Sequence, residues 1–222
     1  SNTFTITRAT GAETTPVSLN SDNSFVTYRA GVVLHPTPWS SVYYMRGTSA
    51  NPPAECVSIT NGQQALAPVT STIDEIGAKA DILDKKLSLN AAVFRIRKEN
   101  DIENQGTSAN PDYVTVGTTQ VQGFEFGATG RITPQWSISG GYAYLESKVI
   151  NSAIVTNIGH ELAVTPKNSF SVFTTYDLDS KWTVGGGAFF VDSRWSSVAN
   201  DARIPGYWRF DAMAAYKVDK NL

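Results

Sequence analysis

The sequence predicts an all-β fold, an antiparallel meander of about nine or ten strands that forms part of a transmembrane barrel. Three observations support this fold class. Apolar and polar residues alternate with a period of two in segments of about ten residues. Very short turns and long polar connections follow one another in strict alternation. Tryptophans recur next to the short turns.

The connections between the expected strands fall into two length classes. The short turns lie at residues 35–38, 83–86, 132–135 and 178–181. The long connections are polar and cover roughly residues 49–72, 98–112, 147–167 and 192–205. A soluble β-sandwich has no reason to sort its loops in this way. An outer-membrane barrel does, because its tight turns face the periplasm and its long loops face the outside.

Each expected strand is justified by an alternation between two faces. In chain order, the expected strands are residues 26–34, 42–45, 74–82, 87–96, 122–132, 135–144, 169–176, 182–191 and 207–218. Residues 4–8 fit either a tenth strand or a loop. Residues 42–45 have no assignable face, and in 87–96 the apolar residues change sides near Arg95. That change indicates either a β-bulge or the point at which the strand leaves the membrane.

The polar faces carry charged residues, including Arg29, Lys79, Glu125 and Asp211. In a small soluble barrel this face would be buried, and unpaired charges there would be costly. A wide barrel has a wet or plugged lumen in which they stay solvated. A sheet with its polar face in water explains the alternation as well, but not the sorted loops. The barrel interpretation assigns to the lipid Phe210, Ala212, Ala214 and Tyr216, and to the lumen Arg209, Asp211 and Lys217.

Three tryptophans share a position relative to the short turns. Trp39, Trp136 and Trp182 each follow such a turn by one or two residues. Trp favours the membrane interface, where its ring is in an apolar environment and its N–H stays in contact with water. The shared position predicts an aromatic girdle at the periplasmic side.

Composition and motifs exclude several classes of function. The net charge is −2, so no basic excess points to nucleic acid. No apolar run approaches the roughly 18 residues of a membrane helix. The single cysteine, Cys56, is expected to be a free thiol, the alternative being a partner outside this chain. His35 and His160 lack metal-ligand spacing, and we find no catalytic motif. We therefore expect no enzyme activity, no bound metal and no cofactor.

Several segments resemble the barrel of TonB-dependent siderophore receptors. They are IDEIGAK at residues 73–79, LSLNAAVFR at 87–95, VQGFEF at 121–126, GYAYL at 141–145 with TPKN at 165–168, and PGYWRFD at 205–211. The first two resemble the family pattern E-G-x-K followed by L-S-L-x-A-A-x-F, and the third resembles V-x-G-x-E. One departure is the lack of an aromatic residue before Glu75. The order and spacing of the segments extend the resemblance over nearly the whole chain.

The resemblance implies a barrel of about twenty-two strands that surrounds a plug domain. Residues 1–222 would be part of that barrel, with the plug and the terminal strands outside this sequence. The implied function is uptake of a ferric siderophore across the bacterial outer membrane. The implied partners are the siderophore, the TonB complex through the plug, and outer-membrane lipid. The alternative is a passive porin-like or structural barrel; an outer-membrane enzyme has no nucleophile constellation to support it.

Five residues are candidate ligand contacts. Ferric siderophores are bulky and often anionic, so arginines and aromatic residues near the outer loops would suit them. The candidates lie at loop–strand junctions on the outer side and are Tyr113, Arg194, Trp195, Arg203 and Tyr207. The alternative role for each is membership of an outer aromatic girdle with solvated arginines.

Overall fold

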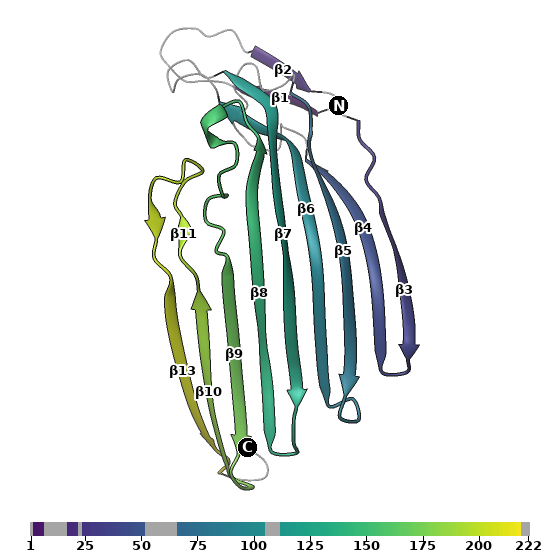
Figure 1. The fold of residues 1–222 in the computed structure, drawn as a ribbon, viewed down its shortest axis with the longest axis vertical. Helices are drawn as coiled ribbons and strands as arrows, with labels where there is room; N and C mark the ends of the chain where they lie inside the picture. Colours follow the sequence, from purple (N-terminus) through teal and green to yellow (C-terminus); the bar gives the residue numbers. More distant parts are fainter. Residues whose placement is uncertain (1, 7–16, 22–23, 52–65, 105–111, 219–222) are drawn as a thin grey trace.

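The computed structural model describes residues 2–6, 17–21, 24–51, 66–104 and 112–218. Nine of its strands form one antiparallel sheet. In chain order these strands are β3 (Arg29–Thr37), β4 (Ser40–Asn51), β5 (Val69–Ile82), β6 (Leu87–Asn104), β7 (Tyr113–Arg131), β8 (Trp136–Asn151), β9 (Asn168–Asp177), β10 (Trp182–Val191) and β13 (Tyr207–Tyr216). Strands that follow one another in this list are paired, with β3 and β13 at the two edges, so the sheet is the predicted meander (Figure 1).

Smaller elements lie outside this sheet. β1 (Asn2–Ile6) pairs with β2 (Val17–Ser21), and β11 (Arg194–Trp195) pairs with β12 (Arg203–Ile204). A 3-10 turn, η2, covers Val155–Asn157. In the described part of the chain, no helix is long and apolar enough to cross a membrane.

The connections are sorted by length as the sequence predicts. The turns at residues 83–86, 132–135 and 178–181 each join two neighbouring strands, and they lie together at one end of the sheet (Figure 1). The connections 152–167 and 192–206 lie at the opposite end. Leu83, Asp84 and Lys85 have φ between 53° and 63°, the left-handed backbone of a tight turn.

The structure corrects several boundaries. β3 continues to Thr37, so the first short turn is residues 38–39 and Trp39 lies within it. β6 runs on to Asn104, although residues 98–112 were expected to be a loop. From Lys98 to Asn104 every residue except Ile102 is polar, so no alternation marks this stretch as a strand. Of the possible strand at residues 4–8, residues 4–6 lie in β1, which belongs to a separate sheet, and residues 7–8 lie outside the described residues. Cys56 lies outside the described residues.

The nine-stranded sheet has almost no hydrophobic core of its own. Among the described residues, the buried apolar side chains are Leu87, Ala92 and Val149. Large apolar residues are instead exposed, such as Val32 at 61% and Phe210 at 74%. A soluble sandwich would cover this face with a second layer. A single layer with one apolar face requires another apolar phase against it, and lipid provides one.

Strand register shows which side chains share a face. One apolar row crosses six neighbouring strands, in the order Val32, Tyr44, Ile76, Val93, Phe124, Tyr144. Phe210 lies opposite Ala188 on this lipid side, whereas Arg209 lies opposite Phe189 on the other face. The two predicted faces of the last strand are therefore separated as expected.

The apolar character of the outward face ends at one level. The next outward row toward the long connections is Arg46, Asp74, Arg95, Gln122, Glu146. Pairing between β5 and β6 is continuous from Leu87 to Glu99, so the β-bulge considered near Arg95 is wrong. The register shift between β6 and β7 lies further out, between Lys98 and Asp101. The change of sides at Arg95 fits a strand that leaves the membrane.

Candidate ligand-binding region

The connection between β10 and β13 brings together three of the five predicted contact residues. Arg194 and Trp195 form β11, and Arg203 belongs to the β12 strand paired with it. The Arg203 guanidinium lies 4.2 Å from the centre of the Trp195 ring. Its Nη1 also donates to Ser193 Oγ at 3.1 Å. A cation held on an aromatic face at the outer end suits an anionic aromatic ligand.

Tyr207 lies on the inward face of the sheet, where the β10–β13 connection ends. It is the first residue of β13 and lies opposite Val191. Its ring centre is 6.0 Å from that of Phe189, and the Arg209 guanidinium lies 5.2 Å from the Phe189 ring. Arg209 Nε contacts Asp211 Oδ2 at 3.2 Å. Tyr207 therefore begins an aromatic and charged column that runs down the inward face.

Tyr113 is placed elsewhere. It begins β7 and lies opposite Asn104 at the end of β6. Within the described part of the chain, no hydrogen bond, ion pair or ring contact joins Tyr113 to the other four residues. Of the five predicted residues, Arg194, Trp195 and Arg203 therefore lie together in the β11–β12 pair, whereas Tyr207 begins β13 and Tyr113 begins β7.

Arg194 has an unused hydrogen-bond donor. Its Nη1 is buried and has no partner among the described residues. Buried donors are normally satisfied by protein or water, so an unpaired one calls for an explanation. This donor gives the β10–β13 connection a second cationic group beside Arg203.

The connections at the outer end are tied to one another by hydrogen bonds. The Asn200 amide accepts from Glu161 N at 2.9 Å and donates to Glu161 O at 2.9 Å. His160 Nδ1 lies 3.0 Å from Val198 O. Val164 N donates to Trp195 O at 2.8 Å. These bonds join connection 152–167 to connection 192–206, so the two can position the Arg203–Trp195 pair together.

Glu103, near the end of strand β6, is bonded to the start of connection 152–167. Glu103 Oε2 accepts from Ser152 Oγ at 2.8 Å and from Ala153 N at 2.7 Å. None of these three residues stood out in the sequence, because the two bonds link positions about fifty residues apart. Only the strand register brings the end of β6 beside the start of connection 152–167.

Two hydrogen bonds stabilise the charged form of Asp192 at the base of the β10–β13 connection. Asn168 Nδ2 donates to its Oδ2 at 2.8 Å, and Ser193 N donates to its Oδ1 at 2.7 Å. The bond from Asn168, the bond from Ser193 and the nearby charges of Arg203 and Lys167 lower the pKa of Asp192. Lys167 Nζ is 2.7 Å from Glu161 Oε1, and this partner raises the pKa of Lys167.

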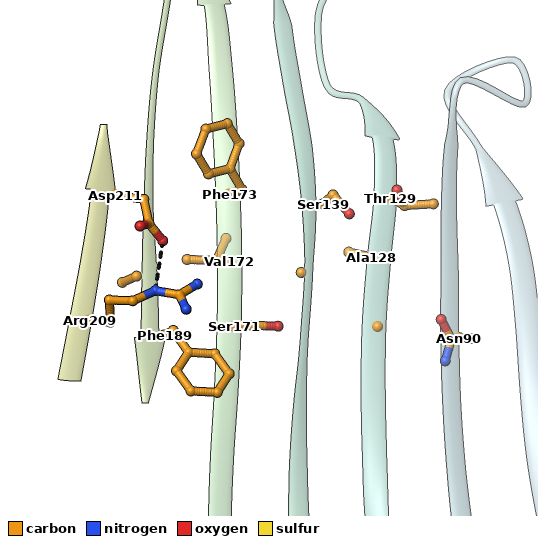
Figure 2. A pocket seen from close by; sticks show the side chains of 13 residues that line it. Asn90, Ala128, Thr129, Ser139, Ser171, Val172, Phe173, Phe189, Arg209 and Asp211 are labelled. Carbon is orange, nitrogen blue, oxygen red and sulfur yellow. Dashed lines mark hydrogen bonds and ion pairs between the residues drawn. The ribbon is translucent and has the colours of Figure 1, made fainter. Parts of the chain in front are cut away.

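The inward face below this region is hollowed (Figure 2). One hollow has a volume of about 410 Å³ and is lined by side chains from β6 to β13. Its polar and aromatic lining includes Asn90, Ser171, Phe173, Phe189, Arg209 and Asp211. Sequence reasoning identified Arg209 and Asp211 as lumen charges but did not identify Asn90, Phe173 or Phe189 as site residues. Only the strand register identifies these three residues, because it places their side chains on the inward face.

A metal centre is not formed by the part of the chain that the structure describes. No group of three His, Cys, Asp or Glu side chains comes together there. The groups that this region presents are aromatic faces, guanidinium groups and hydrogen-bonding side chains.

Comparison with known proteins gives one consistent family. The family described as "TonB dependent receptor-like, beta-barrel" matches residues 2–222. The probable TonB-dependent siderophore receptor PiuA of Acinetobacter baumannii is 37% identical over 221 residues, which cover 91% of this chain and 29% of that protein. The catecholate siderophore receptor Fiu of Escherichia coli K12 is 30% identical over 227 residues, covering 96% of this chain and 30% of that protein.

Solved structures give the same result. The crystal structure of PiuA from Acinetobacter baumannii matches with a TM-score of 0.85 and 33% identity, over 96% of this chain and 32% of that one. The closed form of Fiu from E. coli K12 matches with a TM-score of 0.78 and 31% identity, over 97% and 32%. The chain thus spans about a third of the length of the receptors that it matches.

Proposed function

Because this chain belongs to the β-barrel family of the TonB-dependent receptors, we propose that it supplies barrel strands to a bacterial outer-membrane receptor for ferric siderophores. The receptor takes up its cargo with energy from the TonB complex. The cargo is the ferric siderophore, and no resident cofactor is part of the proposal. Contact with the TonB complex is assigned to a plug domain outside residues 1–222.

One observation carries this proposal. The nine-stranded sheet matches the crystal structure of a siderophore receptor with a TM-score of 0.85 at 33% identity. The match covers 96% of this chain. Two of the relatives, at 37% and 30% identity, have names that specify siderophore receptors, and these names support the proposed cargo class.

The proposed route starts at the outer end and continues along the inward face. Arg203 on Trp195, together with the unpaired Arg194 donor, forms an anion-binding entrance. Tyr207 and Phe189 continue it with aromatic surface. The hollow with Arg209 and Asp211 lies further along the wall. Tyr113 is proposed as a separate contact on the β6–β7 side.

Deletion of the gene that encodes this chain tests the proposal. Cells grown under iron limitation would be supplied with radioactive ferric complexes of catecholate, hydroxamate and carboxylate siderophores, one at a time. We expect uptake of at least one complex to fall to background and to return when the gene is restored. Removal of TonB should give the same loss. Uptake that persists without TonB would indicate a passive porin instead.

A further inference from the structure

A polar surface on the outward side of β6, β7 and β8 has no role in the proposed transport route. We call it the outer cradle, and it consists of Arg95, Arg97, Gln120, Gln122 and Lys148. Register fixes its layout: Arg95 lies opposite Gln122, and Arg97 lies opposite Gln120, which in turn lies opposite Lys148. The side chains of all five lie on the same outward face of the sheet as those of Val93 and Phe124.

The acidic residues around the outer cradle are already engaged. Asp74 accepts from Arg46 at 3.0 Å and from Tyr44 at 2.8 Å. Glu146 accepts from Tyr144 and Gln122, and Glu99 pairs with Arg97 at 2.8 Å. Arg95 and Lys148 are exposed and have no hydrogen-bond or ion-pair partner among the described residues. The cradle therefore holds two free cations on either side of β7.

The surface directly below the outer cradle is apolar. Val93, Phe124 and Tyr144 form the last apolar row before it, and the Phe124 and Tyr144 rings stack with centres 5.5 Å apart. A ligand that uses both surfaces needs an anionic head joined to an apolar body. This continuity with the lipid-facing side favours a lipid over a soluble anion.

We propose that the outer cradle binds the phosphate group of an anionic lipid in the outer leaflet. Arg95 on β6 and Lys148 on β8 hold the phosphate from two sides. Gln120 and Gln122 on β7 supply amide groups between them. The acyl chains lie along Val93, Phe124 and Tyr144. The inference rests on the outer-membrane location in the proposed function, but not on the identity of the transported cargo.

Lipid binding to the purified protein tests the proposal. The intact product of the gene would be purified in a neutral detergent and titrated with dioleoyl phosphatidic acid, with dioleoylglycerol as the matched lipid that lacks the phosphate. Native mass spectrometry would count the lipid retained. We expect phosphatidic acid to be retained and dioleoylglycerol not. At about tenfold per 1.4 kcal/mol and about 1 kcal/mol per cation, Arg95→Gln with Lys148→Gln should weaken retention about 30-fold.

Matched variants separate the cradle from general charge effects. Arg131→Gln with Lys181→Gln removes two cations at the opposite end of the sheet and should retain lipid like the wild type. Arg95→Lys with Lys148→Arg keeps both charges and should restore most of the binding, which also controls for folding. Equal loss in the cradle and control variants would overturn the proposal. Displacement of the lipid by an equal concentration of inorganic phosphate would overturn the assignment to a lipid.

The result is separable from the transport proposal. Lipid retention is measured on the purified protein, so a receptor that transports no siderophore still gives a readable result. Conversely, a receptor that transports a siderophore and retains no phosphatidic acid would refute the outer cradle alone.

Discussion

The two halves of the same strands have opposite polarity. In the half next to the short turns, the outward side chains are apolar, such as Ala78 and Ala91, and the inward ones are polar, such as Lys79 and Asn90. Beyond the Val93–Phe124 row, the outward side carries Arg95, and the inward side carries apolar residues: Ile73, Ile96, Val121 and Leu145. We call these the membrane half and the outer half.

The difference between the halves arises without a break in the sheet. Pairing of β5 with β6 is continuous across the boundary, so side chains continue to alternate between the outward and inward faces without a shift. What changes is the medium outside the wall, from lipid to water. The level at which the outward row changes from apolar to charged therefore marks the outer edge of the bilayer.

The largest expected effect comes from a new charge on the outward face of β5. Ala78 lies in the membrane half and Thr72 in the outer half, and both side chains lie on the outward face. Ala78→Arg should lower the free energy of unfolding by about 2–4 kcal/mol, and Thr72→Arg by about 0–1 kcal/mol. Urea unfolding of the intact receptor in phosphatidylcholine vesicles measures both. Equal costs at the two positions would remove the distinction between the halves.

A smaller effect is expected on the inward face of the membrane half. Tyr43 lies opposite Gly77, and its ring covers the place where a Cβ on Gly77 would stand. Gly77→Ala should therefore lower the free energy of unfolding by about 1–3 kcal/mol through overpacking. Gly186→Ala is the matched control, because the nearest atom to its new Cβ is 3.5 Å away. If removal of the Tyr43 ring does not relieve the cost, the packing explanation is wrong.

In the outer half, Arg203→Ala tests the proposed entrance. Loss of a cation held on the Trp195 ring should weaken ferric siderophore binding about 2- to 30-fold, the range for about 0.5–2 kcal/mol. Equilibrium binding to the intact receptor, with a ligand identified by the uptake assay, measures this. Arg131→Ala at the opposite end should bind normally. Unchanged binding by the Arg203 variant would exclude the pair as a contact.

The smallest effect concerns Asp192 at the base of the entrance. The pKa of Asp192 is lower in the folded protein than in the unfolded chain. The carboxylate therefore contributes to the free energy of unfolding above the unfolded pKa of Asp, and this contribution is lost as the pH falls through the folded pKa. Hydrogen exchange at the Ser193 amide, which donates to this carboxylate, should therefore be more protected at neutral pH than under strongly acidic conditions, after correction for the intrinsic exchange rate. Asp192→Asn should remove this dependence. A dependence that survives the substitution has another origin.

The sequence was sufficient to predict the meander and the two faces of most of its strands, because the alternation of apolar and polar residues is a local property. The turns at residues 83–86, 132–135 and 178–181 were predicted correctly. The extension of β6 beyond Lys98 was missed, since strands above the membrane are wet on the outside and show no lipid-facing pattern. Register across several strands was needed to see the boundary at Arg95 as a single level.

The candidate site was less predictable than the fold. Arg203 and Trp195 were chosen for their chemistry, and the structure brings them into contact. The hydrogen bonds between the neighbouring connections and strands, such as those of Asn200 with Glu161 and of Ser152 with Glu103, join residues far apart in the sequence. Such contacts depend on which connections end side by side, and no single segment encodes that.

Cysteine accessibility along β6 tests the central claim most directly. After Cys56→Ser, single cysteines would replace Ala91, Val93, Arg95 and Arg97, which share the outward parity. In intact cells, we predict that a membrane-impermeant maleimide labels positions 95 and 97 but not 91 and 93. In vesicles, a fluorophore at 91 or 93 should be quenched by brominated lipid. Labelling of all four positions, or of none, would contradict a bilayer boundary between Val93 and Arg95.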